Sequence, residues 1–257
     1  MGDKQNARIA FANAARLGFD EKIKENALFN YAVITYELSF TPFNEAISGF
    51  LEFIELYPNS RRIDEAHTFL VNAYLNTRNY GEALLSLDRI KNKTPQIRKA
   101  YQRVAFYRGL ELFSNLRFED AIDMMNLSLQ FAQFNPTIAA QSHYWMGEAY
   151  YRLADYDKAI NSYNRFLLSP GAFNLNEYIL THYNLGYSFF KKRDYQNALT
   201  WFRKYLSLTR EAPTRLVGDA LNRIGDCFFI MTQYKTAIEF YDRAIKNERY
   251  FIGTAKQ

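Results

Sequence analysis

A three-part spacing recurs along this chain and limits its possible folds more than any other feature. Gly147 is followed nine residues later by Tyr156 and twelve residues later by Ala159. The same distances separate a glycine, an aromatic residue and an alanine at three further places: Gly109, Phe118 and Ala121; Gly186, Tyr195 and Ala198; and Gly225, Tyr234 and Ala237. Because these internal distances never change, the pattern indicates one structural unit that is repeated.

The alanines give the period of the repeat. Successive members are 37 to 39 residues apart: Ala46, Ala83, Ala121, Ala159, Ala198 and Ala237. An aromatic residue also stands three places before the first two of them, as Phe43 and Tyr80. Within one unit, apolar residues at helical spacing lie on both sides of a polar break, such as "ADYD" at residues 154–157. We therefore predict pairs of antiparallel helices that cross closely at the glycine and the alanine, with aromatic rings beside the contact.

Such helix pairs cannot bury both of their faces alone, so they are expected to stack. The predicted fold is all-α, a right-handed α-α superhelix (solenoid) forming a single domain over residues 1–257. Six repeats are expected over residues 20–247, with a partial repeat over residues 3–18 and a C-terminal tail over residues 248–257. Both ends are interpreted as cuts through a longer stack, and their exposed faces would favour self-association.

Local chemistry predicts several helix boundaries. Asp20 and Asp155 have the short carboxylate that caps a helix N-terminus. Pro95, Pro136 and Pro213 suit the first turn of a helix, where the missing N–H costs nothing.

The repeat resembles the tetratricopeptide repeat. Three motifs have its pattern: Gly147-x2-Tyr150 with Ala159-x3-Tyr163, Gly186-x2-Phe189 with Ala198-x3-Phe202, and Gly225-x2-Phe228 with Ala237-x3-Tyr241. The first two units are degenerate, with Ile34 and Val71 in place of glycine. The resemblance implies a scaffold for protein–protein interaction, belonging to a longer multi-repeat protein. The period exceeds the family's usual length of about 34 residues and is similar to that of bacterial cell-envelope members. It therefore favours the envelope or periplasm, with any signal peptide outside this sequence.

Composition excludes several classes of protein. The 42 Phe and Tyr residues argue against a disordered chain. The net charge of +5 is spread along the sequence, which is weak evidence for nucleic-acid binding. Cys227 is the only cysteine, so no intrachain disulfide can form. The longest apolar runs are too short to span a membrane.

Three histidines occupy the same place in their repeats, four residues before the glycine position: His67, His143 and His182. This recurrence suggests metal binding, but equivalent helices in neighbouring repeats lie on the order of 10 Å apart. Zinc needs nitrogen ligands at about 2 Å, so we expect packing roles, no metal and no cofactor. Because phosphate-binding loops, nucleophile elbows and HExxH stretches are also missing from the sequence, we do not expect an enzyme.

Basic residues cluster at residues 61–62, 91–99 and 191–193. All three clusters fall at predicted helix ends, where solvated cations complement the helix dipole. RNA binding would require them to align in one track with exposed aromatic side chains. An RNA-binding module and a self-assembling structural repeat are therefore kept as alternatives to a protein-binding scaffold.

The first helices of the pairs are expected to line a concave groove that binds a protein or peptide. The predicted lining residues stand three before, one after and four after each glycine. They form an aromatic lining with acidic and amide groups toward the C-terminal end. Its members are Phe106, Leu110, Tyr144, Glu148, Tyr151, Tyr183, Tyr187, Phe190, Asn222 and Asp226. The first two positions of each triplet are expected to be the more exposed. The third position, which includes Tyr151 and Phe190, has an equally strong interpretation as core.

This lining also argues against one kind of ligand. Members of the family that grip a C-terminal carboxylate use a clamp of Lys, Asn and Arg in this groove, and only Asn184 is of a matching type here. An extended or helical peptide with apolar side chains fits better, with a basic group near Glu148 and Asp226.

Overall fold

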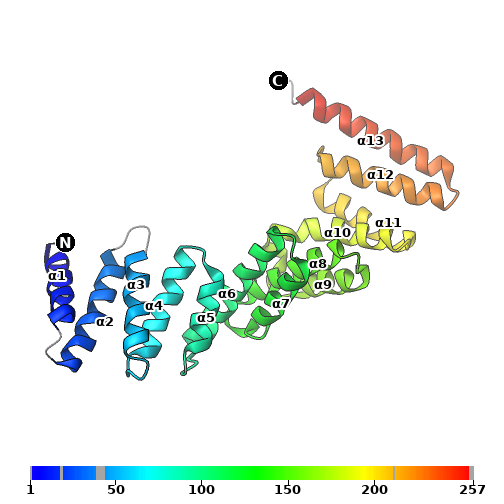
Figure 1. Ribbon diagram of the computed structural model, residues 1–257. Helices are drawn as coiled ribbons and strands as arrows, with labels where there is room; N and C mark the ends of the chain where they lie inside the picture. Colours follow the sequence, from blue (N-terminus) through cyan, green and yellow to red (C-terminus); the bar gives the residue numbers. More distant parts are fainter. Residues whose placement is uncertain (1, 18–19, 39–43, 211, 255–257) are drawn as a thin grey trace. The chain divides into compact units, whose positions relative to one another are not determined.

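The computed structural model describes residues 2–17, 20–38, 44–210 and 212–254, and these residues form helices without any strand. Consecutive helices run antiparallel (Figure 1). In chain order they are α1 (Gly2–Leu17), α2 (Glu21–Leu38), α3 (Asn44–Leu56), α4 (Ile63–Asn76), α5 (Tyr80–Arg89), α6 (Pro95–Ser114), α7 (Phe118–Leu129), η1 (Ala132–Phe134), α8 (Pro136–Arg152), α9 (Tyr156–Leu168), η2 (Ala172–Asn174), α10 (Glu177–Lys191), α11 (Tyr195–Thr209), α12 (Arg215–Ile230) and α13 (Tyr234–Thr254). The predicted all-α solenoid of antiparallel helix pairs is confirmed.

The chain divides into two compact units, Met1–Arg108 and Gly109–Gln257. The boundary falls inside α6, which is one continuous helix. A single domain over the whole chain stays a prediction. Helix α13 continues to Thr254, beyond the expected end of the repeats at residue 247.

The repeated glycine makes room for a side chain of the second helix. A Cβ added at Gly147 would lie 2.6 Å from the ring of Tyr163, and one added at Gly186 would lie 2.7 Å from the ring of Phe202. The equivalent distances are 2.7 Å from Gly109 to Met125 and 2.5 Å from Gly225 to Tyr241. Each partner stands four residues after the repeated alanine, so the close crossing of the two helices is confirmed. The glycine is needed because a large side chain occupies the space where its Cβ would be.

The repeated aromatic residue has its own partner. In the second unit it packs edge-on against the residue four places after the glycine, and the ring centroids are 5.3 to 5.6 Å apart. The pairs are Phe113 with Phe118, Tyr151 with Tyr156, Phe190 with Tyr195, and Phe229 with Tyr234. Each pair bridges the turn between two helices, and such contacts contribute about 0.5–1.5 kcal/mol beyond burial. Phe43, which stands at this position in the first repeat, lies outside the described residues.

The turn inside each helix pair explains why the distance from glycine to alanine never changes. Five residues before the alanine, the backbone adopts the left-handed conformation, with φ between 58° and 63°, at Arg78, Leu116, Ala154, Arg193 and Thr232. In the pair α8–α9, the Ala154 N–H donates to the Tyr151 carbonyl at 3.1 Å and the Asp155 N–H donates to the Tyr150 carbonyl at 2.9 Å. These two bonds form a Schellman motif. The same bonds recur in the other four turns, which sets the turn length.

Because none of these five turn residues is glycine, replacing one with glycine should stabilise the protein. Thr232 is the most strained candidate, since it is β-branched and has φ of 62°. We expect Thr232→Gly to raise the free energy of unfolding by about 1 kcal/mol, as measured by urea denaturation. Glu239→Gly, in the exposed interior of α13, should lower it by about 1 kcal/mol. A loss of stability with Thr232→Gly would contradict this account of the turn.

Several predicted boundaries are confirmed. Asp20 accepts from the Lys22 N–H at 2.7 Å, and Asp155 accepts from the Lys158 N–H at 3.2 Å. Pro95 and Pro136 begin α6 and α8. Pro213 does not lie in a first turn, because Thr214 caps α12 and the helix begins at Arg215.

The single cysteine belongs to the core of the second unit. Cys227 is fully buried on α12, and burial raises the pKa of its thiol to about 12. A thiol in this state is protonated at neutral pH and inert, so Cys227 has a packing role.

Candidate functional site

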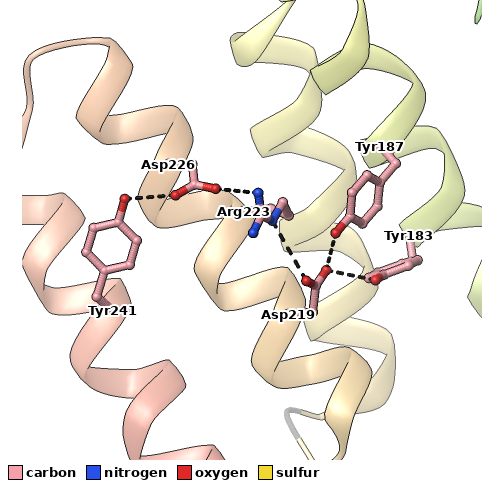
Figure 2. A network of polar contacts seen from close by, with 6 residues as sticks. All are labelled: Tyr183, Tyr187, Asp219, Arg223, Asp226 and Tyr241. Carbon is pink, nitrogen blue, oxygen red and sulfur yellow. Dashed lines mark hydrogen bonds and ion pairs between the residues drawn. The ribbon is translucent and has the colours of Figure 1, made fainter.

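Polar groups connect α10, α12 and α13 across one face of the second unit (Figure 2). Asp219 of α12 lies opposite α10, where its Oδ2 accepts hydrogen bonds from the hydroxyls of Tyr183, at 2.7 Å, and Tyr187. Burial and the nearby carboxylate raise the pKa of both phenols well above the usual value. The two tyrosines therefore stay neutral hydrogen-bond donors at physiological pH.

Arg223 extends this network along α12. Its guanidinium lies between two carboxylates, with Nη1 2.6 Å from Asp226 Oδ2 and Nε 3.8 Å from Asp219 Oδ1 (Figure 2). The guanidinium carbon also lies 5.8 Å from the ring centroid of Phe190. From the other side, the Tyr241 hydroxyl of α13 donates to Asp226 Oδ1 at 2.9 Å. The charged groups of this face thus hold one another in fixed positions.

A pocket of about 190 Å³ opens beside this network, between α8, α9 and α10. Its charged residues are Glu148 and Arg152. The rest of its lining is aromatic or amide: Tyr151, Tyr163, Tyr183, Asn184 and Tyr187. Glu148 Oε1 accepts from the Tyr163 hydroxyl at 2.7 Å and from the Asn184 side-chain amide. The pocket therefore combines four tyrosines with one oriented carboxyl group.

Burial dominates the electrostatics of Glu148. It raises the carboxyl pKa above the ordinary value, against the opposing effects of the Tyr163 hydrogen bond and the Arg152 charge. The carboxylate is thus incompletely compensated by the protein itself.

The structure brings together part of the predicted groove lining. Glu148, Tyr151, Tyr183 and Tyr187 share the pocket. Phe190 and Asp226 contact Arg223, as described above. Asn222 is exposed and, with Asp219, borders a separate hollow between α12 and α13. Phe106 and Leu110 are both on α6, but they belong to different compact units.

The expected exposure of the position three residues before each glycine is wrong for two residues. Phe106 is only 4% exposed and Tyr144 only 5% exposed. At about 100° per residue, this position points about 60° from the glycine direction, beside the second helix. The side chain is buried there in Phe106 and Tyr144, half-buried in Tyr183 and exposed in Asn222. The Tyr144 ring accordingly packs against Tyr163 and Phe166. Neither residue can offer an exposed ring to a partner.

Four important side chains of this face were not in the predicted lining: Tyr163, Asn184, Asp219 and Arg223. Asp219 and Arg223 stand six and two residues before Gly225 and, with Asp226, follow the spacing i, i+4, i+7 of one helix face. That spacing is a sequence signal that would have found both of them. Tyr163 carried no such signal. It lies on the second helix of its pair, its ring is buried in the core, and only its hydroxyl reaches Glu148.

The recurring histidines are part of the packing between helices. His67 is 2% exposed and His182 is 3% exposed, and Nδ1 of His182 lies 2.9 Å from the Tyr178 carbonyl. His143 is half-buried. Within the described ranges, no three His, Cys, Asp or Glu side chains come together in a way that could hold a metal ion.

These histidines predict how stability depends on pH. Burial lowers the pKa of all three below 6.5, so the unfolded chain binds more protons than the folded one as the pH falls. The free energy of unfolding should therefore decrease from pH 7.5 to pH 5.5, by at most about 1.4 kcal/mol per pH unit for each histidine. Glu148, with its raised pKa, acts in the opposite direction near its own titration range. Urea denaturation at both pH values checks this, and His67→Gln should show a smaller decrease. A rise in wild-type stability at pH 5.5 would contradict it.

The fold and this face define an all-α repeat protein built from stacked helix pairs. Residues 177–247 match a family model described as tetratricopeptide repeat, and residues 141–169 match a second model with the same description. These two stretches of the chain are tetratricopeptide repeats. Stacked repeats of this kind present extended surfaces for other proteins, and the chain is accordingly a protein-interaction repeat scaffold.

Solved structures with the same fold include a BtubC (BKLC) structure from P. vanneervenii, with a TM-score of 0.54 and 13% identity over 82% of this chain and 89% of that chain. A MamA protein structure has a TM-score of 0.51 and 16% identity over 74% of this chain and 94% of that chain. MamA 41-end from Desulfovibrio magneticus RS-1 has a TM-score of 0.51 and 15% identity over 73% and 96% of the two chains. These similarities concern the fold alone. A search of curated protein sequences gives no match.

No helix in the described part of the chain is both long and apolar enough to cross a membrane.

Proposed function

We propose that the second unit binds a peptide segment of a partner protein along the face formed by α8, α10 and α12, with a side chain of the segment in the Glu148 pocket. The observation that carries this proposal is the pocket itself, where three half-buried tyrosines, Tyr151, Tyr183 and Tyr187, stand around one oriented carboxyl group. Tyrosine suits such recognition because it offers a large, rigid surface and a hydroxyl at low entropic cost. The proposed function is binding, without a chemical step.

The surroundings of the pocket support this proposal. Asp219, Arg223 and Asp226 continue the polar face along α12, and their mutual contacts hold them in place before any ligand arrives. A preorganised surface loses less entropy on binding than a mobile one.

Selection of random displayed peptides on the immobilised full chain tests the proposal. We expect enrichment of related sequences whose binding Tyr151→Ala weakens by about tenfold or more. Tyr156→Ala is the matched control, because it breaks the same ring pair, at 5.5 Å, from the side that does not line the pocket.

The two variants separate a binding effect from a folding effect. Equal weakening by Tyr151→Ala and Tyr156→Ala would indicate a loss of stability only and would count against the pocket. Failure to enrich any related sequences would overturn the proposed function.

A further inference from the structure

We propose that the Glu148 pocket is selective for an organic cation, the ammonium or guanidinium end of a lysine or arginine side chain in the partner segment. This inference rests on the proposed peptide-binding function and names the chemistry of the group that enters the pocket.

The lining is the first argument for a cation. The half-buried rings of Tyr151, Tyr183 and Tyr187 line the pocket together with one carboxyl group, and the buried Tyr163 contributes its hydroxyl. A cation is attracted to the faces of such rings, and the attraction reaches about 2 kcal/mol where water is excluded. Anionic groups are disfavoured by the same rings and by Glu148.

The state of Glu148 is the second argument. Its Oε1 accepts two hydrogen bonds, from Tyr163 and Asn184, while a carboxylate has about four acceptor positions. The Tyr144 hydroxyl also acts on this carboxyl group by a hydrogen bond. These partners orient the group and leave at least one acceptor position for a ligand. An entering ammonium or guanidinium group would find an acceptor already in position. Its positive charge would also stabilise the Glu148 carboxylate, which is partly shielded from water.

Arg152 is the cation that the protein already has near this carboxyl group. It lines the pocket, its charge acts on Glu148, and its side chain is exposed to solvent. An exposed arginine contributes little to a buried partner because water and salt screen it. It would nevertheless compete with an incoming cation, so its removal should strengthen binding.

Titration of the full chain with small probes tests the inference without any partner. The probes are N-acetyl-lysine amide, its Nζ-trimethyl form, N-acetyl-arginine amide and the neutral N-acetyl-norleucine amide, and the readout is NMR of isotope-labelled tyrosine rings. We expect saturable shifts with one or more of the cations, with Kd on the order of 1 mM, and none with the norleucine probe. The rank of the three cations identifies the preferred group. Lowering the pH into the range where Glu148 takes up a proton should weaken binding.

Two variants give opposite expectations. Glu148→Gln keeps the shape of the side chain and should weaken cation binding by about tenfold. Arg152→Gln should tighten it, a result that damage to the fold cannot produce. Equal shifts with the neutral probe, no saturable shift with any cation, or unchanged affinity in Glu148→Gln would overturn the inference.

The cation titration and the peptide selection test the two proposals separately. Enriched peptides together with no cation binding would refute this inference and leave the proposed function standing. Saturable cation binding without any enriched peptide would refute the proposed function alone.

Discussion

Replacing Gly186 with alanine should lower the free energy of unfolding by up to about 2 kcal/mol. The new Cβ would lie 2.7 Å from Cδ1 and Cε1 of Phe202, a side chain that is completely buried and cannot swing aside. Overpacking of this kind costs about 1–3 kcal/mol, and it exceeds the gain of about 1 kcal/mol from the better helix propensity of alanine. Urea denaturation of the two proteins measures the difference.

The matched control is Gly81→Ala, in the first turn of α5. The nearest atom to a Cβ at Gly81 is 4.0 Å away, on Arg108, so only the propensity gain remains and stability should rise by up to about 1 kcal/mol. A double-mutant cycle then isolates the contact, because Phe202→Leu removes part of the ring that the new methyl group meets. Additive effects of Gly186→Ala and Phe202→Leu would show that the two residues do not interact as described.

Replacing Asp219 with alanine should cost about 2–3 kcal/mol, the other large effect expected in this protein. The change removes the carboxylate that accepts hydrogen bonds from two tyrosine hydroxyls of α10. It also removes the anion that pairs with Arg223. Hydrogen bonds to a charged group contribute more than neutral ones, and half-buried hydroxyls regain only part of that energy from water. The free energy of unfolding again provides the measurement.

Tyr183→Phe and Tyr187→Phe provide the controls for Asp219→Ala. Each removes one hydroxyl and keeps the ring, so each should cost less than the loss of the carboxylate. The ring contacts of Tyr183 and Tyr187 with Phe202 would remain, with centroids 5.9 and 5.4 Å apart. If Asp219→Ala were no more destabilising than either tyrosine variant, the carboxylate would not be the centre of the network.

The sequence carried enough information for the helix pairs because their contact is steric and local. Gly186 and Ala198 stand at a fixed distance, and the ring that requires the glycine, Phe202, stands four residues beyond the alanine. The turn conformation could not be predicted. Residues such as Leu116 and Arg193 occupy the left-handed position without glycine or asparagine to mark it. The division within α6 was invisible as well, because nothing interrupts the helical pattern there.

The site was predicted only in part because its lining depends on the angular position of each residue around the helix. Positions three before and four after the glycine point about 60° and 40° from it, beside the partner helix. A ring there can be buried, as in Tyr144, or can line the pocket, as in Tyr151 and Tyr183. Positions six before, two before and one after point about 120°, 160° and 100° away. Asp219 and Arg223 lie in this second group, whereas Tyr144 lies in the first and is buried. The Tyr163 hydroxyl reaches this face from the second helix of its pair. The spacing of residues along the first helix therefore could not predict it.

The most direct test of the account is to locate a bound peptide on the protein. A selected peptide with a photoreactive residue beside its anchor can be crosslinked to the full chain, and the modified residues can be identified by mass spectrometry. The account predicts crosslinks on α8, α10 and α12 around Glu148, Tyr187 and Asp219. Crosslinks concentrated instead on the exposed residues of α9 and α11, such as Leu168 and Arg203, would contradict it.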